Sequence, residues 1–224
     1  GVMLLAIDTS TQKIGLALYD GAQVLHEAVW PSAYHHTVEL APAIEKALRG
    51  VGATVADLDV ICVAGGPGSF TGMRIGLAVA KGLAMAANIP LVSVPTLDVV
   101  AKAQPVQPDM QLAAVLVAGR RNLAVGWYQA EEGKWLMNKS EVLSVENLSK
   151  RIRKPTLICG ELSAEIRKLL GRKRKNAVLV SPAQSIRRPA ILAEMGWARW
   201  QTGELEDLAT LAPNYLHSGE PIPS

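Results

Sequence analysis

Short apolar runs separated by polar turns fill the first hundred positions of the chain. The runs Met3–Ile7, Ile14–Tyr19 and Gln23–Trp30 predict three consecutive strands. Asp20-Gly21, between the second and third runs, is a hairpin signal and makes that pair antiparallel. The sequence therefore predicts a three-stranded antiparallel start.

The pattern then changes to helical spacing and to solidly apolar strands. Apolar residues at every fourth position predict a helix over residues 40–48, and Pro42 inside it predicts a late start or a kink. The runs Asp59–Ala64 and Ile89–Val94 are mostly apolar, as expected for parallel strands covered on both faces. A long apolar helix is expected between these two strands.

The same order of elements recurs after a linker rich in proline and glutamine at residues 105–111. The expected strands are Leu112–Ala118, Leu123–Tyr128, a run from Trp135, Thr156–Cys159 and Ala177–Val180; the expected helices are Val145–Ile152, Glu161–Leu170 and one from Pro189 to Trp200. Two such copies predict a duplicated α/β fold of the actin-like (RNase H-like) class, each lobe having a mixed sheet with covering helices. The predicted lobes are residues 1–104 and a degenerate second copy, residues 105–224.

Composition limits the class of protein without identifying its activity. About half of the 224 residues are hydrophobic, and no apolar run reaches the ~18 residues of a membrane span. The start lacks the basic region of a signal peptide, and Gly1-Val2 ahead of Met3 is interpreted as a cloning remnant. Cys62 and Cys159 lie in apolar runs and are expected to be reduced core thiols.

Charge is distributed unevenly between the two halves. Residues 1–108 hold six Lys/Arg and eight Asp/Glu, whereas residues 109–224 hold the other 17 basic and 12 acidic residues. The basic half includes the run Arg172–Lys175. A solvated loop is the favoured interpretation of this run; a nucleic-acid contact is the alternative, weakened by the lack of interleaved aromatic residues.

The first polar turn is a candidate nucleotide contact. Its residues are Asp8, Thr9, Ser10 and Thr11, and hydroxyl groups with backbone N–H groups can hold phosphate while an aspartate organises Mg²⁺. The alternative is an aspartate that caps a turn between strands. The matching turn of the second copy, residues 118–122, has no carboxylate, so efficient ATP hydrolysis by this chain alone is not expected.

A glycine-rich loop follows the fourth expected strand. Its turn motif is Gly66, Pro67, Gly68, Ser69, Phe70 and Thr71. The spacing is not that of a dinucleotide fingerprint, a Walker loop or a hydrolase elbow. We interpret the motif mainly as a tight turn from strand to helix.

Metal sites and nucleophiles are not indicated. The histidines are His26, His35, His36 and His217, and no pair of them has metal-binding spacing on a helix. We predict no metal and no catalytic residue.

The helix after the glycine loop is apolar nearly all round and carries small residues at every fourth position. A ridge of this kind lets another backbone approach closely. Packing against the chain's own sheet covers one side, and we expect a partner protein on the other. The interface residues expected from this helix and from the earlier one are Leu40, Ile44, Leu48, Gly72, Met73, Gly76, Leu77, Ala80 and Ala84.

These motifs closely resemble those of the TsaB (YeaZ) family. The resemblance rests on Ala6–Thr11, on Gly66–Gly72 with the small-residue helix Met73–Ala84, and on Pro213-Asn214-Tyr215-Leu216. It is strong over residues 3–100 and loose afterwards. The family's second-lobe Asp-Ala-Arg-Arg turn stands here as Ala118–Arg121 without the aspartate, and His217 stands where arginine is usual.

The resemblance implies an actin-like fold and a part in making threonylcarbamoyladenosine in tRNA. It implies a non-catalytic, cytoplasmic subunit that pairs with the enzyme TsaD through its N-terminal helices, with the ATPase TsaE joining the assembly and tRNA reached through the complex. A homodimer is expected when the chain is alone. No cofactor is expected on this chain, because the wider complex would bind the ATP or ADP. Peptidase activity, which the older glycoprotease label suggests, is not expected either.

Two hypotheses therefore stand against each other. The first is an activating scaffold that uses the two N-terminal helices. The second is an independent nucleotide-dependent phosphotransferase or ATPase that uses the turn Asp8–Thr11.

Overall fold

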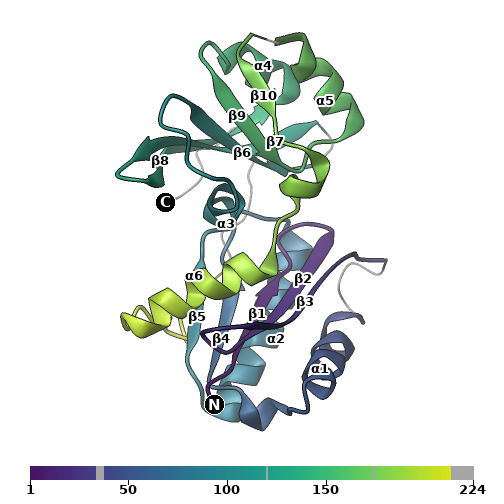
Figure 1. Cartoon of the computed structure of the whole chain (residues 1–224). Coiled ribbons are helices and arrows are strands. Elements are labelled where there is room, and N and C mark those ends of the chain that lie inside the picture. Colours follow the sequence, from purple (N-terminus) through teal and green to yellow (C-terminus); the bar gives the residue numbers. More distant parts are fainter. Residues whose placement is uncertain (34–37, 120, 174, 213–224) are drawn as a thin grey trace. The chain divides into compact units, whose positions relative to one another are not determined.

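The computed structural model of the chain describes residues 1–33, 38–119, 121–173 and 175–212 (Figure 1). The chain forms two compact units. Unit 1 comprises Gly1–Thr96 and the described residues from Arg188 onward, and unit 2 runs from Leu97 to Arg187. Among the described residues, no helix combines the length and the apolar character of a membrane span.

Unit 1 is built on a five-stranded mixed sheet with the strand order β3-β2-β1-β4-β5. Strand β2 is antiparallel to its neighbours β1 and β3, and β4 and β5 run parallel to β1. The elements of this unit are β1 (Leu4–Asp8), β2 (Lys13–Tyr19), β3 (Val24–Pro31), α1 (Leu40–Gly50), the 3-10 turn η1 (Val55–Asp57), β4 (Val60–Ala64), α2 (Phe70–Ala87), β5 (Leu91–Val94) and α6 (Pro189–Gln201).

Unit 2 repeats this plan with the order β10-β9-β6-β7-β8. Strands β6 to β8 are antiparallel, and β9 and β10 run parallel to β6. Its elements are α3 (Thr96–Lys102), β6 (Gln111–Val117), β7 (Asn122–Glu131), β8 (Lys134–Ser144), α4 (Val145–Arg151), β9 (Thr156–Gly160), α5 (Ala164–Leu170), η2 (Gly171–Lys173), β10 (Ala177–Leu179) and η3 (Pro182–Ser185). The duplicated actin-like fold predicted from the sequence is confirmed.

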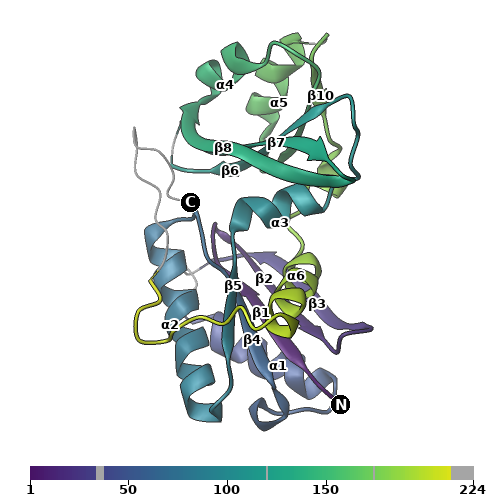
Figure 2. The same cartoon turned by 90° about the vertical axis from the view of Figure 1, so that its left-hand side faces the viewer.

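The last helix of each predicted lobe belongs to the other unit: α3 belongs to unit 2 and α6 to unit 1. The division into units therefore differs from the predicted boundary at residue 104. Helix α6 packs across β1, β2, β4 and β5 of unit 1, as Figure 2 shows. Gly196 allows this close approach, because a Cβ atom there would lie 2.2 Å from the Cys62 sulfur. Helix α3, which was not predicted from the sequence, places Leu97 and Val100 in the core of unit 2.

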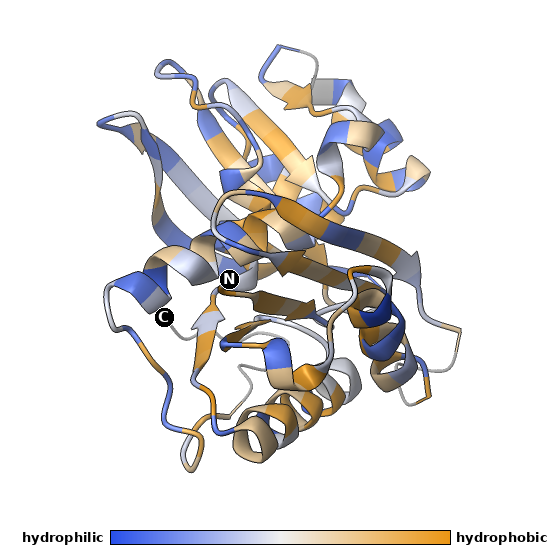
Figure 3. Ribbon diagram, turned by 60° about the horizontal axis from the view of Figure 1, so that its bottom comes forward, coloured by the Kyte–Doolittle hydropathy of each residue, from blue (hydrophilic) through white to orange (hydrophobic). Residues whose placement is uncertain are grey.

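The cores follow from the apolar strands. In unit 1 the buried side chains of β1, β2 and β4 pack with those of α1 and α2, and Figure 3 shows hydrophobic residues along these strands and along α2. Pro42 neither delays nor breaks α1, which begins at Leu40; in the first helical turn its missing N–H removes no intrahelical bond.

Candidate functional site

The predicted nucleotide turn after β1 is buried and hydrogen-bonded within unit 1. Asp8, Thr9, Ser10 and Thr11 are all buried. The Thr9 hydroxyl donates to the backbone oxygen of Gly72 at 2.7 Å, and the Ser10 hydroxyl lies 2.9 Å from that of Thr96. Two of the three hydroxyls expected to meet phosphate thus hold the turn against the start of α2 and the start of α3.

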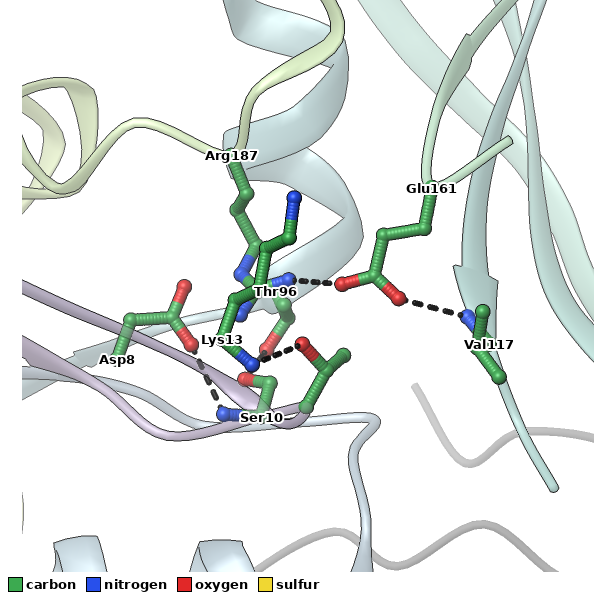
Figure 4. Close-up of polar contacts among 8 residues, drawn as sticks. Asp8, Ser10, Lys13, Thr96, Val117, Glu161 and Arg187 are labelled. Carbon is green, nitrogen blue, oxygen red and sulfur yellow. Dashed lines mark hydrogen bonds and ion pairs between the residues drawn. The ribbon is translucent and has the colours of Figure 1, made fainter. Parts of the chain in front are cut away.

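The remaining polar groups of the turn also have local partners. The Asp8 carboxylate accepts a hydrogen bond from the Ser10 backbone N–H at 3.0 Å, and the Thr11 hydroxyl accepts one from the Lys13 backbone N–H at 3.2 Å (Figure 4). These bonds are typical of an aspartate and a threonine that fix a tight turn. The geometry is that of the capping alternative, and nucleotide binding at these residues stays a prediction.

The glycine loop is packed onto the same turn. The Ser69 backbone N–H donates to the Ser10 carbonyl at 2.8 Å, and the Gly66 N–H donates to the Thr96 hydroxyl at 3.1 Å. A Cβ atom on Gly68 would lie 2.7 Å from the Ser10 carbonyl oxygen, and one on Gly76 only 2.0 Å from the Thr9 hydroxyl oxygen. The glycines therefore let the loop and α2 approach the turn after β1, in agreement with the interpretation of the motif as a strand-to-helix turn.

The small-residue ridge of α2 lies on the inner face of the helix. Met73, Ala80 and Ala84 are at most 3% exposed, and Gly72, Gly76 and Leu77 are buried as well. The expectation that these residues form a partner interface is corrected: the ridge fits the helix to the chain's own sheet, because small side chains are needed where two backbones approach closely.

The outer face of α2 consists of different residues. The exposed and half-buried positions between Thr71 and Ala86, which we call the α2 outer face, are Thr71, Arg74, Ile75, Ala78, Val79, Lys81, Gly82, Leu83, Met85 and Ala86. Arg74 and Lys81 are the two ionisable residues in this set. The Lys81 ammonium group donates to the Leu211 carbonyl oxygen. Apolar side chains thus face outward on this helix.

The three interface residues expected from α1 are also core residues. Leu40, Ile44 and Leu48 are between 1% and 3% exposed. Ile44 and Leu48 nevertheless line the floor of a groove of about 580 Å³. The groove lies between α1, η1 and α2, and its other lining residues are Ala41, Glu45, Arg49, Ala53, Thr54, Val55, Ala56, Val79 and Leu83.

The turn of unit 2 that corresponds to Asp8–Thr11 is held by an ion pair. The Val117 backbone N–H donates to the Glu161 carboxylate at 3.2 Å, and the other oxygen of Glu161 lies 2.6 Å from the Arg187 guanidinium (Figure 4). The Arg187 side chain is 5% exposed and that of Glu161 is 18% exposed. The Val117 N–H group therefore already donates to a carboxylate of the chain and is not available to bind phosphate.

The remaining titratable groups of the core have structural surroundings. Burial raises the pKa of the Cys62 thiol well above its ordinary value and that of Cys159 to about 12. Burial also raises the pKa of Tyr128, whose hydroxyl donates to the Asp98 carboxylate at 2.7 Å. Both thiols are therefore protonated at neutral pH, as expected for core cysteines. The described residues contain no cluster of His, Cys, Asp or Glu side chains that could hold a metal ion.

Three residues that hold these turns were not predicted from the sequence: Thr96, Glu161 and Arg187. Each is distant in sequence from its partner, and no local motif marks it. Some predictions lie outside the described residues: His35, His36, Arg120 and His217, and the motif Pro213-Asn214-Tyr215-Leu216. The side chain of Phe70 is likewise not described.

Comparisons with known proteins connect this arrangement to tRNA modification. A family model described as "TsaD: tRNA N6-adenosine threonylcarbamoyltransferase" matches residues 28–153. The chain is 32% identical to the tRNA threonylcarbamoyladenosine biosynthesis protein TsaB of Bacillus subtilis over 225 residues, covering 97% of this chain and 95% of that protein. It is 38% identical over 100 residues to TsaB of Escherichia coli, covering 44% and 42%. The solved structure of YeaZ from Pseudomonas aeruginosa matches with a TM-score of 0.75 and 26% identity, over 96% of this chain and all of that one.

Proposed function

The chain belongs to the TsaB family, and on that premise we propose that it acts in tRNA threonylcarbamoyladenosine biosynthesis as an activating subunit of a TsaD-type enzyme. The observation that supports this proposal best is the α2 outer face, which presents apolar side chains to solvent beside an apolar groove. Exposed apolar surfaces of this kind mark protein–protein contacts.

The docking surface in this proposal combines the α2 outer face with the groove against α1. A helix of the partner would place its apolar side chains between Val79 and Leu83 on one side and Val55 on the other. Glu45 and Arg49, a solvent-exposed i,i+4 ion pair on α1, lie at the same groove and suit a polar rim. The same surface would serve self-association when the chain is alone.

The polar turns favour a non-catalytic role for the chain. In unit 1 the hydroxyls of Thr9 and Ser10 bond to Gly72 and Thr96, and in unit 2 Glu161 takes the Val117 N–H. Phosphoryl transfer depends on groups that are aimed at phosphate and metal. We therefore place the chemistry, and the ATP or ADP, on the other members of a cytoplasmic assembly, namely the TsaD-type enzyme and a TsaE-type ATPase, with tRNA bound by the complex.

The test is a charge placed on the α2 outer face without disturbing the core. Ala78→Arg changes an exposed residue of α2, and Ala198→Arg makes the same change at an exposed position of α6 in the same unit. Both variants should unfold within about 0.5 kcal/mol of the parent, as surface substitutions usually do. Ala78→Arg should lose co-purification with the TsaD-type enzyme and reduce tRNA modification to the level without this chain, because a desolvated unpaired charge opposes association.

Ala198→Arg should retain both properties. If Ala78→Arg also retained co-purification and modification, the docking surface would be wrong. If the parent protein neither bound the enzyme nor raised modification, the proposed function itself would be wrong.

A further inference from the structure

Basic side chains gather in one stretch of unit 2. Residues 145–175 contain ten Lys/Arg and three Asp/Glu, a net charge of +7, whereas the rest of the chain is at −4 because the whole chain is at +3. The stretch spans α4, β9, α5 and η2 and reaches the residue before Asn176. A surface this basic on an otherwise acidic chain calls for an explanation.

The sheet register brings distant parts of this stretch to one end of the sheet. Thr156, the first residue of β9, pairs with Ala177, the first residue of β10, and the two strands are parallel. Arg153 and Lys154 directly precede β9, and Lys175 directly precedes β10. All three therefore lie at the end where both strands begin.

The two helices deliver further cations to this end. Helix α4 ends at Arg151, a few residues before β9 begins, and α5 ends at Leu170, a few residues before β10 begins. Figure 1 shows α4, α5 and β10 together on this part of unit 2. We call the cations there the basic end; its members are Lys150, Arg151, Arg153, Lys154, Lys168, Arg172 and Lys175.

Contacts within the chain leave most of the basic end available to a ligand. Arg151 pairs with Glu141 at 3.1 Å. Among the interactions of the described residues, no hydrogen bond or ion pair uses the side chains of the other six members, and all six are exposed. Lys150, Arg151 and Lys168 lie in the last turn of a helix, where a positive charge interacts favourably with the helix dipole. This interaction does not account for the positive charges of Arg153, Lys154, Arg172 and Lys175, which lie outside the α-helices.

We propose that the basic end binds the phosphate backbone of folded RNA. This inference rests on the proposed function, in which the substrate of the assembly is a tRNA. Residues 145–180 contain no aromatic residue, so stacking on single-stranded bases is not the mode of contact. The exposed residues from 150 to 155 are four cations and Pro155, while Ile152 is buried, which suits phosphate contacts better than the apolar centre of a protein interface.

The test measures how salt weakens binding of an unmodified tRNA transcript to the full-length chain, alone and in complex with the TsaD-type enzyme. The basic-end variant is Arg153→Gln/Lys154→Gln/Lys175→Gln. The control is Lys102→Gln/Lys134→Gln/Lys139→Gln, which removes three exposed cations from other parts of unit 2. Each lost phosphate contact lowers the slope of log affinity against log salt by about 0.7–0.9. The basic-end variant should therefore lose about 2–3 from the slope, and the control should keep the parent slope.

Equal slopes for the two triple variants would overturn the proposal. Polyglutamate is the second probe. If the parent chain bound polyglutamate more tightly than the transcript, and the basic-end variant lost that binding, the proposal would also be overturned, because the basic end would then fit an acidic protein. The salt dependence of tRNA binding is measured on the chain alone as well as in the complex. Enzyme association and tRNA modification are measured separately with the Ala78→Arg variant. Failure of this proposal can therefore be distinguished from failure of the proposed function.

Discussion

The two units have the same strand order but present different helices on it. Between the fourth and fifth strands of each copy, unit 1 has α2, with 18 residues and an apolar outer face, whereas unit 2 has α5, with 7 residues and charges at Glu165, Arg167 and Lys168. The two units therefore share one sheet architecture and differ in the helices that cover it. In our proposals unit 1 meets a protein and unit 2 meets RNA.

The corresponding turns also differ in how they are held. In unit 1, hydroxyl groups close the turn after β1 through Gly72 and Thr96. In unit 2, the turn after β6 is held by the carboxylate of Glu161, itself paired with Arg187. In unit 2 a carboxylate paired with an arginine thus takes the place of the Thr9 and Ser10 hydroxyl bonds of unit 1, and the two units should respond differently to substitution.

The largest expected effect comes from two neighbouring arginines that belong to different units. Arg187→Met leaves the Glu161 carboxylate of unit 2 without its buried ion pair and should cost about 3 kcal/mol. Arg188→Met removes a half-exposed pair with Glu27 in unit 1 and should cost at most about 1 kcal/mol.

The measurement is alkylation of the two buried thiols at pH 8, one in each unit. Because burial keeps both thiols protonated, alkylation reports local opening. Arg187→Met should speed the reaction of Cys159 more than that of Cys62. Equal acceleration at both cysteines, or an equal cost for the two variants, would show that the turns are not held independently.

A smaller effect separates the two faces of α2. Gly76→Ala places a methyl group 2.0 Å from the Thr9 hydroxyl oxygen and should cost about 1–3 kcal/mol by overpacking. Gly82→Ala in the same helix meets no atom within 4 Å and should stabilise the protein by up to about 1 kcal/mol. Denaturant unfolding measures both, and stabilisation by Gly76→Ala would contradict the inward position of the ridge.

The smallest effect concerns how the helices begin. The Ser163 hydroxyl of unit 2 accepts a hydrogen bond from the Ile166 N–H at the start of α5, whereas the Ser69 side chain makes no such capping bond at the start of α2. Ser163→Ala should therefore cost about 1 kcal/mol in thermal or denaturant unfolding, and Ser69→Ala only a few tenths. A larger loss at Ser69 would contradict the difference between the two helix starts.

Much of the fold could be predicted from the sequence because each strand is marked by its own residues. Alternation in residues 14–30 and the continuous apolar runs at β4 and β5 identify antiparallel and parallel strands, and the second copy repeats them. The exchange of α3 and α6 between the copies could not be predicted, because an apolar helix face does not specify which sheet it covers.

The candidate site was predicted only in part. The turn Asp8–Thr11 and the glycine loop are visible as motifs, but hydroxyl groups at a turn suit a phosphate and a backbone carbonyl equally well. Their actual partners lie 63 residues away for Thr9 and 86 residues away for Ser10. Only the folded chain brings such residues together.

The sequence by itself determined a duplicated α/β architecture, a smooth small-residue helix and a basic second half. The tertiary structure decided which side of that helix is buried. Because α2 is apolar nearly all round, its pattern gives no strong preference for one face. Glycine and alanine at every fourth position suit contact with the chain's own sheet as well as with a partner. The close approach of α2 to the turn after β1 settles the choice, since a Cβ atom on Gly76 would collide with Thr9, whereas Gly82 on the opposite side has no such neighbour.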